Sequence, residues 1–156
     1  MCAIIGVAMY GVKPSDLELI KKIFIESQIR GKHATGISYL NSKKEIVTFI
    51  HAGPAEEFVE IFDFNNLITD RDTIEMIGHC RYSTSDLEFN QPLVDKENTT
   101  AIVHNGVASQ SSPEEWFELY GITCETRNDS ELLLHSLENM VNRHPSSFWD
   151  EASIAM

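Results

Sequence analysis

The second residue of the chain is a cysteine, followed by an apolar run in the opening segment MCAIIGVAMYG. The trimming enzyme that acts on new chains removes Met1 when the next residue is small, and cysteine qualifies. The mature chain would then carry an α-amine and a thiol on one residue. Their ordinary pKa values of about 7.7–8.0 and about 8.5 suit proton exchange near neutral pH. Taken alone, Cys2 also fits a small buried hydrophobe in a strand.

An arginine and a threonine stand three residues apart in RYST (81–84), at the end of an apolar segment. The planar guanidinium of Arg81 can hold a carboxylate through two hydrogen bonds, and the Thr84 hydroxyl can support it. A surface arginine at a strand end is the alternative interpretation. The segment is therefore a candidate clamp for a substrate carboxylate.

Two candidate donors for an oxyanion follow one another in HNG (104–106). The Asn105 amide and the backbone N–H of Gly106 can stabilise developing negative charge, although Asn-Gly also favours a turn. In NDSE (128–131), Asp129 either caps a helix or binds a substrate ammonium. Arg81 and Asp129 together would recognise both ends of an α-amino acid.

The composition excludes several function classes. The 156 residues, 42% of them hydrophobic and 23% charged, fit one folded domain over 1–156. A formal net charge of -12 disfavours binding to nucleic acid and to anionic membranes. The opening apolar run is too short to span a bilayer and lacks a basic flank, so we expect a cytoplasmic protein. The three widely spaced cysteines predict neither disulfides nor zinc, and we expect no metal and no cofactor.

Helical and strand patterns are mixed along the chain, which favours an α+β fold over a doubly wound parallel sheet. Apolar runs or alternation predict strands over 2–9, 34–40, 45–51, 74–84, 99–106 and 122–125. One helix would begin at a capping box of Ser15 and Glu18 and end at Gly31. Further helices are predicted after Pro54, after the Ser112 capping box up to Gly121, and after an Asn128 or Asp129 cap.

Taken together, these segments resemble a known family. The blocks that carry the resemblance are Cys2 with AIIGV, RGKHATGISY (30–39), HCRYST (79–84), NQPL (90–93), IVHNGV (102–107) and NDSELL (128–133). In this order they resemble the glutaminase domains of class II glutamine amidotransferases, as in glucosamine-6-phosphate synthase and amidophosphoribosyltransferase. These are N-terminal-nucleophile hydrolases. The resemblance implies an α+β fold of the αββα layered-sandwich type, which we expect to be shortened at its C-terminus.

The resemblance also implies a role for each matching residue. Cys2 would attack the side-chain carboxamide of glutamine, with its own α-amine as the proton shuttle. The oxyanion hole would be formed by Asn105 and Gly106, and Arg30 would help to order the nucleophile. Ammonia would leave first, and water would resolve the γ-glutamyl thioester to glutamate. The substrate would be bound by Arg81, Tyr82, Ser83, Thr84 and Asp129.

The sequence also departs from the family. Tyr82 stands where the aminosugar synthase has tryptophan, and His33 stands at an acidic position of the family pattern. Without a synthase domain in the chain, ammonia would pass to a separate synthase or acceptor enzyme, and the oligomeric state stays open. Two other hypotheses remain: a glutamine-binding regulatory module without turnover, and an N-terminal-nucleophile hydrolase of a different amide.

Overall fold

A computed structural model of the chain describes residues 1–83 and 89–143. It divides into two compact units, Met1–Gly106 and Val107–Met156. Helices and antiparallel sheets are both present, so the predicted α+β class is confirmed. The single domain over 1–156 stays a prediction. Among the residues that the structure describes, no helix has the length and apolar character that crossing a membrane requires.

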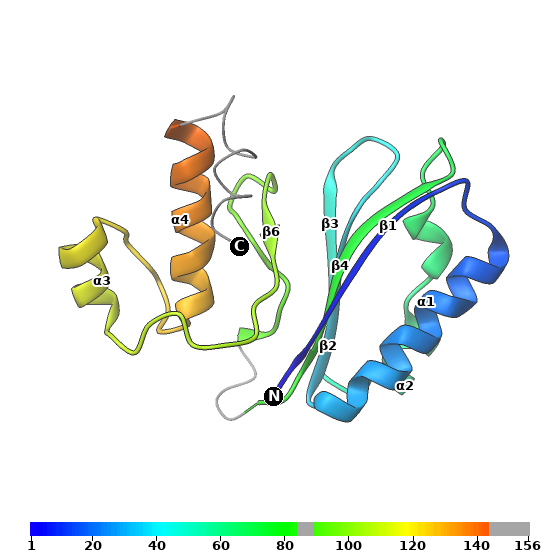
Figure 1. The fold of residues 1–156 in the computed structure, drawn as a ribbon, viewed down its shortest axis with the longest axis horizontal. Helices are drawn as coiled ribbons and strands as arrows, with labels where there is room; N and C mark the ends of the chain where they lie inside the picture. Colours follow the sequence, from blue (N-terminus) through cyan, green and yellow to red (C-terminus); the bar gives the residue numbers. More distant parts are fainter. Residues whose placement is uncertain (84–88, 144–156) are drawn as a thin grey trace. The chain divides into compact units, whose positions relative to one another are not determined.

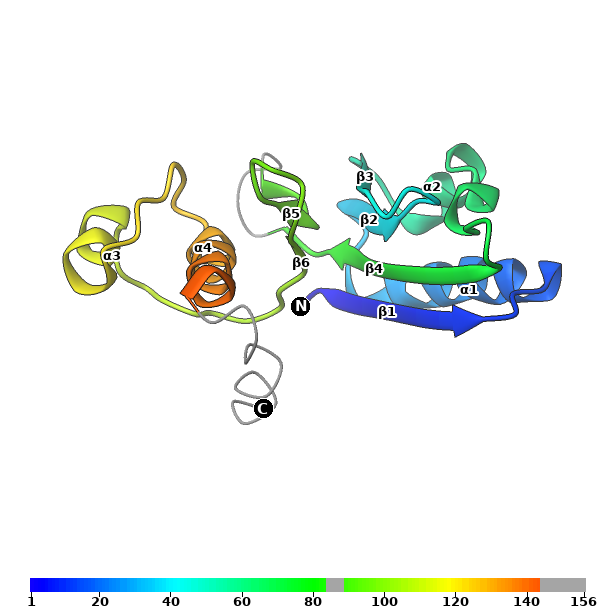
Figure 2. The same ribbon diagram turned by 90° about the horizontal axis from the view of Figure 1, so that it is seen from above.

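The first unit is built on a four-stranded antiparallel sheet. Its strands, in spatial order, are β1 (Ala3–Tyr10), β4 (Thr73–Arg81), β2 (Ala34–Leu40) and β3 (Ile46–His51). The first and fourth strands lie side by side in both views (Figure 1 and Figure 2), with Ala3 opposite Cys80. On the other side of β4, Ala34 lies opposite Arg81. This register brings the N-terminus and the start of β2 to the end of β4.

Two helices, α1 (Pro14–Ser27) and α2 (Ala55–Ile61), cover one face of this sheet (Figure 1). A short 3-10 helix, η2 (Phe64–Leu67), lies within the segment 63–72, which also forms part of the core. The core is rich in aromatic pairs, among them Phe24–Phe58 and Phe62–Phe64. Burial of these rings against the sheet anchors the strands that carry the candidate site.

The opening strand is buried on one face and not on both. Ile5 is buried among the core residues, whereas Ile4 is 52% exposed. Alternate side chains of a strand point to opposite faces of the sheet, and α1 covers one of these faces. The continuous apolar run therefore predicted the strand, and the structure places half of its side chains outside the core.

The start and end of α1 differ from the sequence prediction. The helix begins after Lys13, whose backbone N–H donates to the Asp16 carboxylate at 2.8 Å, so the predicted Ser15–Glu18 box is wrong. It ends at Ser27 and continues as the 3-10 helix η1 (Gln28–Arg30). Gly31 is the C-cap of η1, so the helical segment ends at the predicted residue, but its φ of -175° is extended backbone and not the left-handed conformation typical of a glycine cap.

A second, two-stranded sheet completes the first unit. It pairs β5 (Leu93–Val94) with β6 (Ala101–Ile102), so the strand predicted over 99–106 is much shorter than expected. Asp95 holds the turn between them by accepting from the Thr99 backbone N–H at 2.6 Å and from the Thr99 hydroxyl. The chain beyond β6 is irregular, and this irregular tip carries the HNG motif.

The second unit contains α3 (Pro113–Tyr120) and α4 (Asp129–Arg143). The capping box of Ser112 and Glu115 is confirmed, as is the end of α3 at Gly121. The strand predicted over 122–125 is wrong, because this segment has no strand partner among the described residues. Instead, Ile122 and Cys124 pack with Trp116 into a small core.

Candidate active site

Cys2 lies just before β1, where three distant segments of the first unit meet. Its backbone nitrogen donates a hydrogen bond to Oδ1 of Asn105 at 3.2 Å. Its thiol donates to the backbone oxygen of Tyr82, with 3.8 Å between Sγ and the oxygen. The side chain is half-buried. A thiol that is reachable and already held by two other segments has the placement that a nucleophile requires.

Arg30 approaches the same residue from η1. Its Nε donates to the backbone oxygen of Cys2 at 3.2 Å, and its Nη2 lies 3.6 Å from Sδ of Met1. Met1 is 78% exposed, so the bond that a trimming enzyme must cut is accessible. Removal of Met1 would take away one contact of the guanidinium and leave its contact with Cys2.

A close backbone approach explains why Arg30 is followed by glycine. A Cβ atom on Gly31 would lie 2.3 Å from the carbonyl carbon of Arg81 and 2.4 Å from the nitrogen of Tyr82. No side chain fits at such distances, so Gly31 allows η1 to pack against the end of β4. The same contact places Arg30 beside Cys2.

Arg81 ends β4 and is 8% exposed. Its Nη1 donates to Oδ1 of Asn90 at 2.9 Å, which holds the guanidinium in one orientation. Its neighbour His79 is 1% exposed; burial, together with the Arg81 charge, lowers the pKa of that imidazole to about 4. His79 is therefore neutral at pH 7, and the positive charge at this strand end is that of Arg81.

The Asn105–Gly106 tip is held by a neighbouring side chain. The backbone N–H of His104 donates to Oε1 of Gln91 at 2.6 Å, and Gln91 is itself buried. The Gln91 carbonyl lies against β2, where a Cβ on Gly36 would come within 2.1 Å of its oxygen. Gly36 therefore allows Gln91 to lie against β2, and Gln91 in turn holds the backbone next to Asn105 and Gly106.

The other two cysteines differ from Cys2. Burial raises the pKa of the Cys80 thiol to about 11. Burial also raises the pKa of the Cys124 thiol to about 11, with the Glu131 charge acting in the same direction. Thiols react as thiolates, so both are poor nucleophiles at neutral pH.

Asp129 begins α4 in the second unit. Its Oδ2 accepts from the backbone N–H groups of Ala108 at 2.6 Å and Ser109 at 3.4 Å, so it anchors the segment that follows the HNG motif. Its neighbour Asn128 caps the helix by accepting from Ser130 N at 3.1 Å. Because Asp129 and Arg81 belong to different units, their joint recognition of an amino acid stays a prediction. Thr84 lies outside the described residues.

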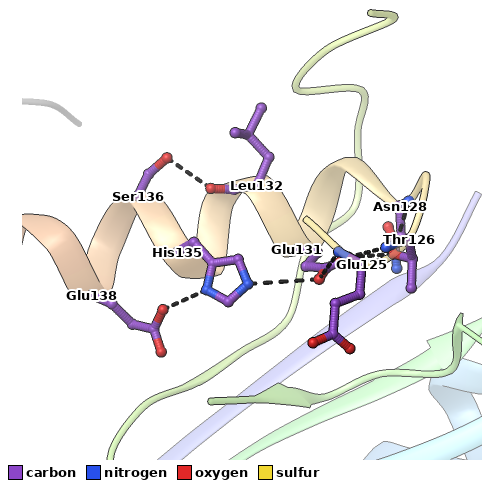
Figure 3. A network of polar contacts seen from close by, with 8 residues as sticks. All are labelled: Glu125, Thr126, Asn128, Glu131, Leu132, His135, Ser136 and Glu138. Atoms are coloured by element: carbon purple, nitrogen blue, oxygen red, sulfur yellow. Dashed lines mark hydrogen bonds and ion pairs between the residues drawn. The ribbon is translucent and has the colours of Figure 1, made fainter. Parts of the chain in front are cut away.

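A polar network fixes the loop that leads into α4 (Figure 3). The Glu131 carboxylate accepts from the backbone N–H groups of Glu125 at 2.7 Å and Thr126 at 2.8 Å. Its Oε1 also lies 3.6 Å from Nε2 of His135, whose Nδ1 contacts Glu138 at 2.5 Å. Glu131 thus binds the backbone N–H of Glu125, in the segment 122–125 that the sequence predicts to be a strand, and that of the next residue, Thr126.

The structure thus brings together Cys2, Arg30, Tyr82 and Asn105. It adds supporting residues that sequence reasoning did not assign a role: Asn90, Gln91 and His33. All three residues lie inside the NQPL and RGKHATG blocks, which mark them as candidates. Their hydrogen bonds, however, join segments that are distant in the sequence and meet only in the folded chain.

Comparisons with protein-family models and with curated proteins give no match to this chain. In the described part of the chain, no group of three or more His, Cys, Asp or Glu residues is arranged to hold a metal ion.

Proposed function

We propose that the protein hydrolyses the side-chain amide of glutamine, with Cys2 as an N-terminal nucleophile after removal of Met1. The observation that carries this proposal is the hydrogen bond from the Cys2 nitrogen to Oδ1 of Asn105. It joins the candidate nucleophile and base to the candidate oxyanion donor. The accompanying architecture would be the αββα sandwich, which is supported by an antiparallel sheet with helices on one face.

The first chemical step follows from these contacts. The thiol of Cys2 would add to the amide carbon of glutamine while its proton passes to the α-amine. Asn105 accepts from the Cys2 nitrogen through Oδ1, so its Nδ2 group takes no part in that bond and can donate to the substrate. With the Gly106 N–H, this group would stabilise the oxyanion, which is worth about 3–4 kcal/mol per donor.

The tetrahedral intermediate that this addition forms would then collapse. The carbon–nitrogen bond breaks, the α-ammonium returns its proton to the leaving nitrogen, and ammonia departs from a γ-glutamyl thioester on Cys2. Water, deprotonated by the same amine, attacks the thioester carbonyl. The carbon–sulfur bond breaks, glutamate is released, and the α-ammonium gives the proton it took from water to the Cys2 thiolate, which restores the thiol and the amine. Ammonia would serve a separate synthase or acceptor enzyme in the cytoplasm.

Substrate recognition would depend on Arg81. Its guanidinium, oriented by Asn90, would bind the α-carboxylate through paired hydrogen bonds, with backbone groups of Tyr82 and Ser83 beside it. The part expected for Thr84, which lies outside the described residues, stays a prediction. That Asp129, which belongs to the second unit, binds the α-ammonium stays a prediction. Amino acids that lack either charged group would then bind poorly.

The experiment measures ammonia and glutamate release from glutamine by the wild-type protein, Cys2→Ala and the control Cys124→Ala. All three keep a small second residue, so Met1 is removed from each. We expect equimolar products from the wild type and the control, and background from Cys2→Ala. Equal background rates in all three would overturn the proposal. Glutamine binding without turnover would indicate a regulatory module, and turnover of another amide a different hydrolase.

A further inference from the structure

His33 contacts three consecutive residues, Arg81–Ser83, where β4 ends: its backbone reaches Arg81, and its imidazole reaches Tyr82 and Ser83. The backbone N–H of Ser83 donates to Nδ1 of His33 at 2.8 Å, and the backbone N–H of His33 donates to the Arg81 oxygen at 3.0 Å. Between them, the Tyr82 ring lies against the imidazole, with 5.0 Å between ring centroids and 42° between planes. His33 therefore holds the backbone on both sides of Tyr82.

The hydrogen bond from Ser83 defines the chemical state of the imidazole. A nitrogen that accepts from a backbone N–H must carry a lone pair, so Nδ1 is unprotonated and the ring proton of the neutral form lies on Nε2. A side chain that replaces His33 must therefore place a hydrogen-bond acceptor as far from its own backbone as Nδ1 is. The asparagine Oδ1 is the same number of bonds from the backbone as this nitrogen.

Residues 81–83, which His33 holds, lie beside the thiol of Cys2. The Tyr82 oxygen lies 3.8 Å from Sγ of Cys2, and Arg81 is the residue that would bind the substrate carboxylate. We propose that His33 is a positioning residue: by accepting from Ser83 N–H, it fixes the 81–83 backbone against the thiol and beside the substrate carboxylate. This inference rests on the proposed function.

The alternative is that His33 contributes only ring contact with Tyr82. The two interpretations are separated by His33→Asn, which keeps the acceptor and loses the ring, and by His33→Leu, which keeps apolar bulk and loses the acceptor. The side chain is exposed, so both variants should fold, and thermal unfolding checks this.

We expect His33→Leu to lower kcat/KM for glutamine by about three- to tenfold, mainly through a higher KM, because one hydrogen bond is lost. His33→Asn should stay within about twofold of the wild type. A second readout is amide hydrogen exchange at Ser83, which does not depend on turnover. Exchange should accelerate by about three- to tenfold in His33→Leu and stay unchanged in His33→Asn.

Unchanged Ser83 exchange in His33→Leu would overturn the inference, as would equal defects in the two variants. A wild-type protein that does not hydrolyse glutamine would overturn the proposed function instead, and Ser83 exchange would still decide whether His33 holds this segment.

Discussion

The backbone nitrogen of Cys2 donates a hydrogen bond to the side-chain oxygen of Asn105, a residue 103 positions away in the sequence. In the chain that retains Met1, this nitrogen is a peptide amide and has no lone pair available for a proton. Loss of Met1 would convert the same atom into an amine at the same place. Asn105 therefore lies where it could orient the proposed catalytic base of a trimmed chain and donate to the proposed oxyanion.

Protein that retains Met1 should be inactive. The amide nitrogen of Cys2 cannot accept the thiol proton, and general-base catalysis typically contributes about 10²–10⁴-fold. The measurement compares glutaminase rates of protein produced with the methionine-trimming enzyme inhibited and the same protein trimmed afterwards in vitro. Equal rates before and after trimming would show that the α-amine of Cys2 takes no part.

Asn105→Asp separates the two functions of the amide. The carboxylate keeps an oxygen that can accept from the Cys2 nitrogen, but the Nδ2 donor is lost and a negative charge is added near the oxyanion. We expect kcat to fall by about 10²–10³-fold with little change in KM. Steady-state kinetics test this, and a variant with wild-type kcat would remove Asn105 from the oxyanion hole.

Gly31→Ala should disturb the packing of η1 against the end of β4. The added methyl would meet backbone atoms of Arg81 and Tyr82 at 2.3–2.4 Å, and backbone cannot give way as a flexible side chain can. We expect a loss of about 1–3 kcal/mol in the free energy of unfolding. Gly6→Ala is the matched control, because its Cβ would have nothing within 4 Å. Urea unfolding should separate the two variants, and similar stabilities would contradict the close approach.

The residues with distinctive chemistry could be predicted from the sequence, whereas the residues that support them could not. Cys2, Arg81 and Asn105 stand out because their side chains are of types that can bind or react, and because each lies at one end of an apolar segment. The sequence indicates Gly31 only as a helix cap, whereas the constraint that requires glycine there is the backbone of Arg81, fifty residues later in the sequence. Such constraints follow from strand register, which local patterns do not determine.

The length of regular elements was also less predictable than their existence. The strands predicted over 34–40 and 45–51 are confirmed as β2 and β3, which pair with each other across the polar segment between them. No strand forms over 122–125; the backbone N–H of Glu125 at its end, and that of Thr126 just beyond it, bond to the Glu131 side chain instead of to a strand. A side chain that replaces a strand partner leaves no local signal in the segment that it binds.

Stability should fall in acid partly through Glu131. Burial acts to raise the pKa of this carboxyl, but hydrogen bonds from Thr126 and Glu125 outweigh it and hold the pKa below the ordinary value of 4.5. The unfolded chain therefore binds this proton more readily, so the contribution is present above pH 4.5 and is lost as the pH falls through the folded value.

Glu131→Gln should consequently be less stable than the wild type at pH 7, by about 1–2 kcal/mol. The difference should shrink towards pH 3, where the wild-type carboxyl is protonated as well. Urea unfolding followed by circular dichroism at both pH values tests this. If the stability difference between Glu131→Gln and the wild type did not depend on pH, the negative charge of Glu131 would not be what stabilises the network.

Intact-mass spectrometry and peptide mapping after exposure to an alkylating analogue of glutamine, with and without excess glutamine, test whether Cys2 is the glutamine-hydrolysing nucleophile. We expect a chain that has lost Met1 and gained one adduct on Cys2, with glutamine protecting it, while Cys80 and Cys124 remain unmodified. A trimmed chain that stays unlabelled, or whose labelling glutamine does not slow, would contradict a glutamine-hydrolysing Cys2.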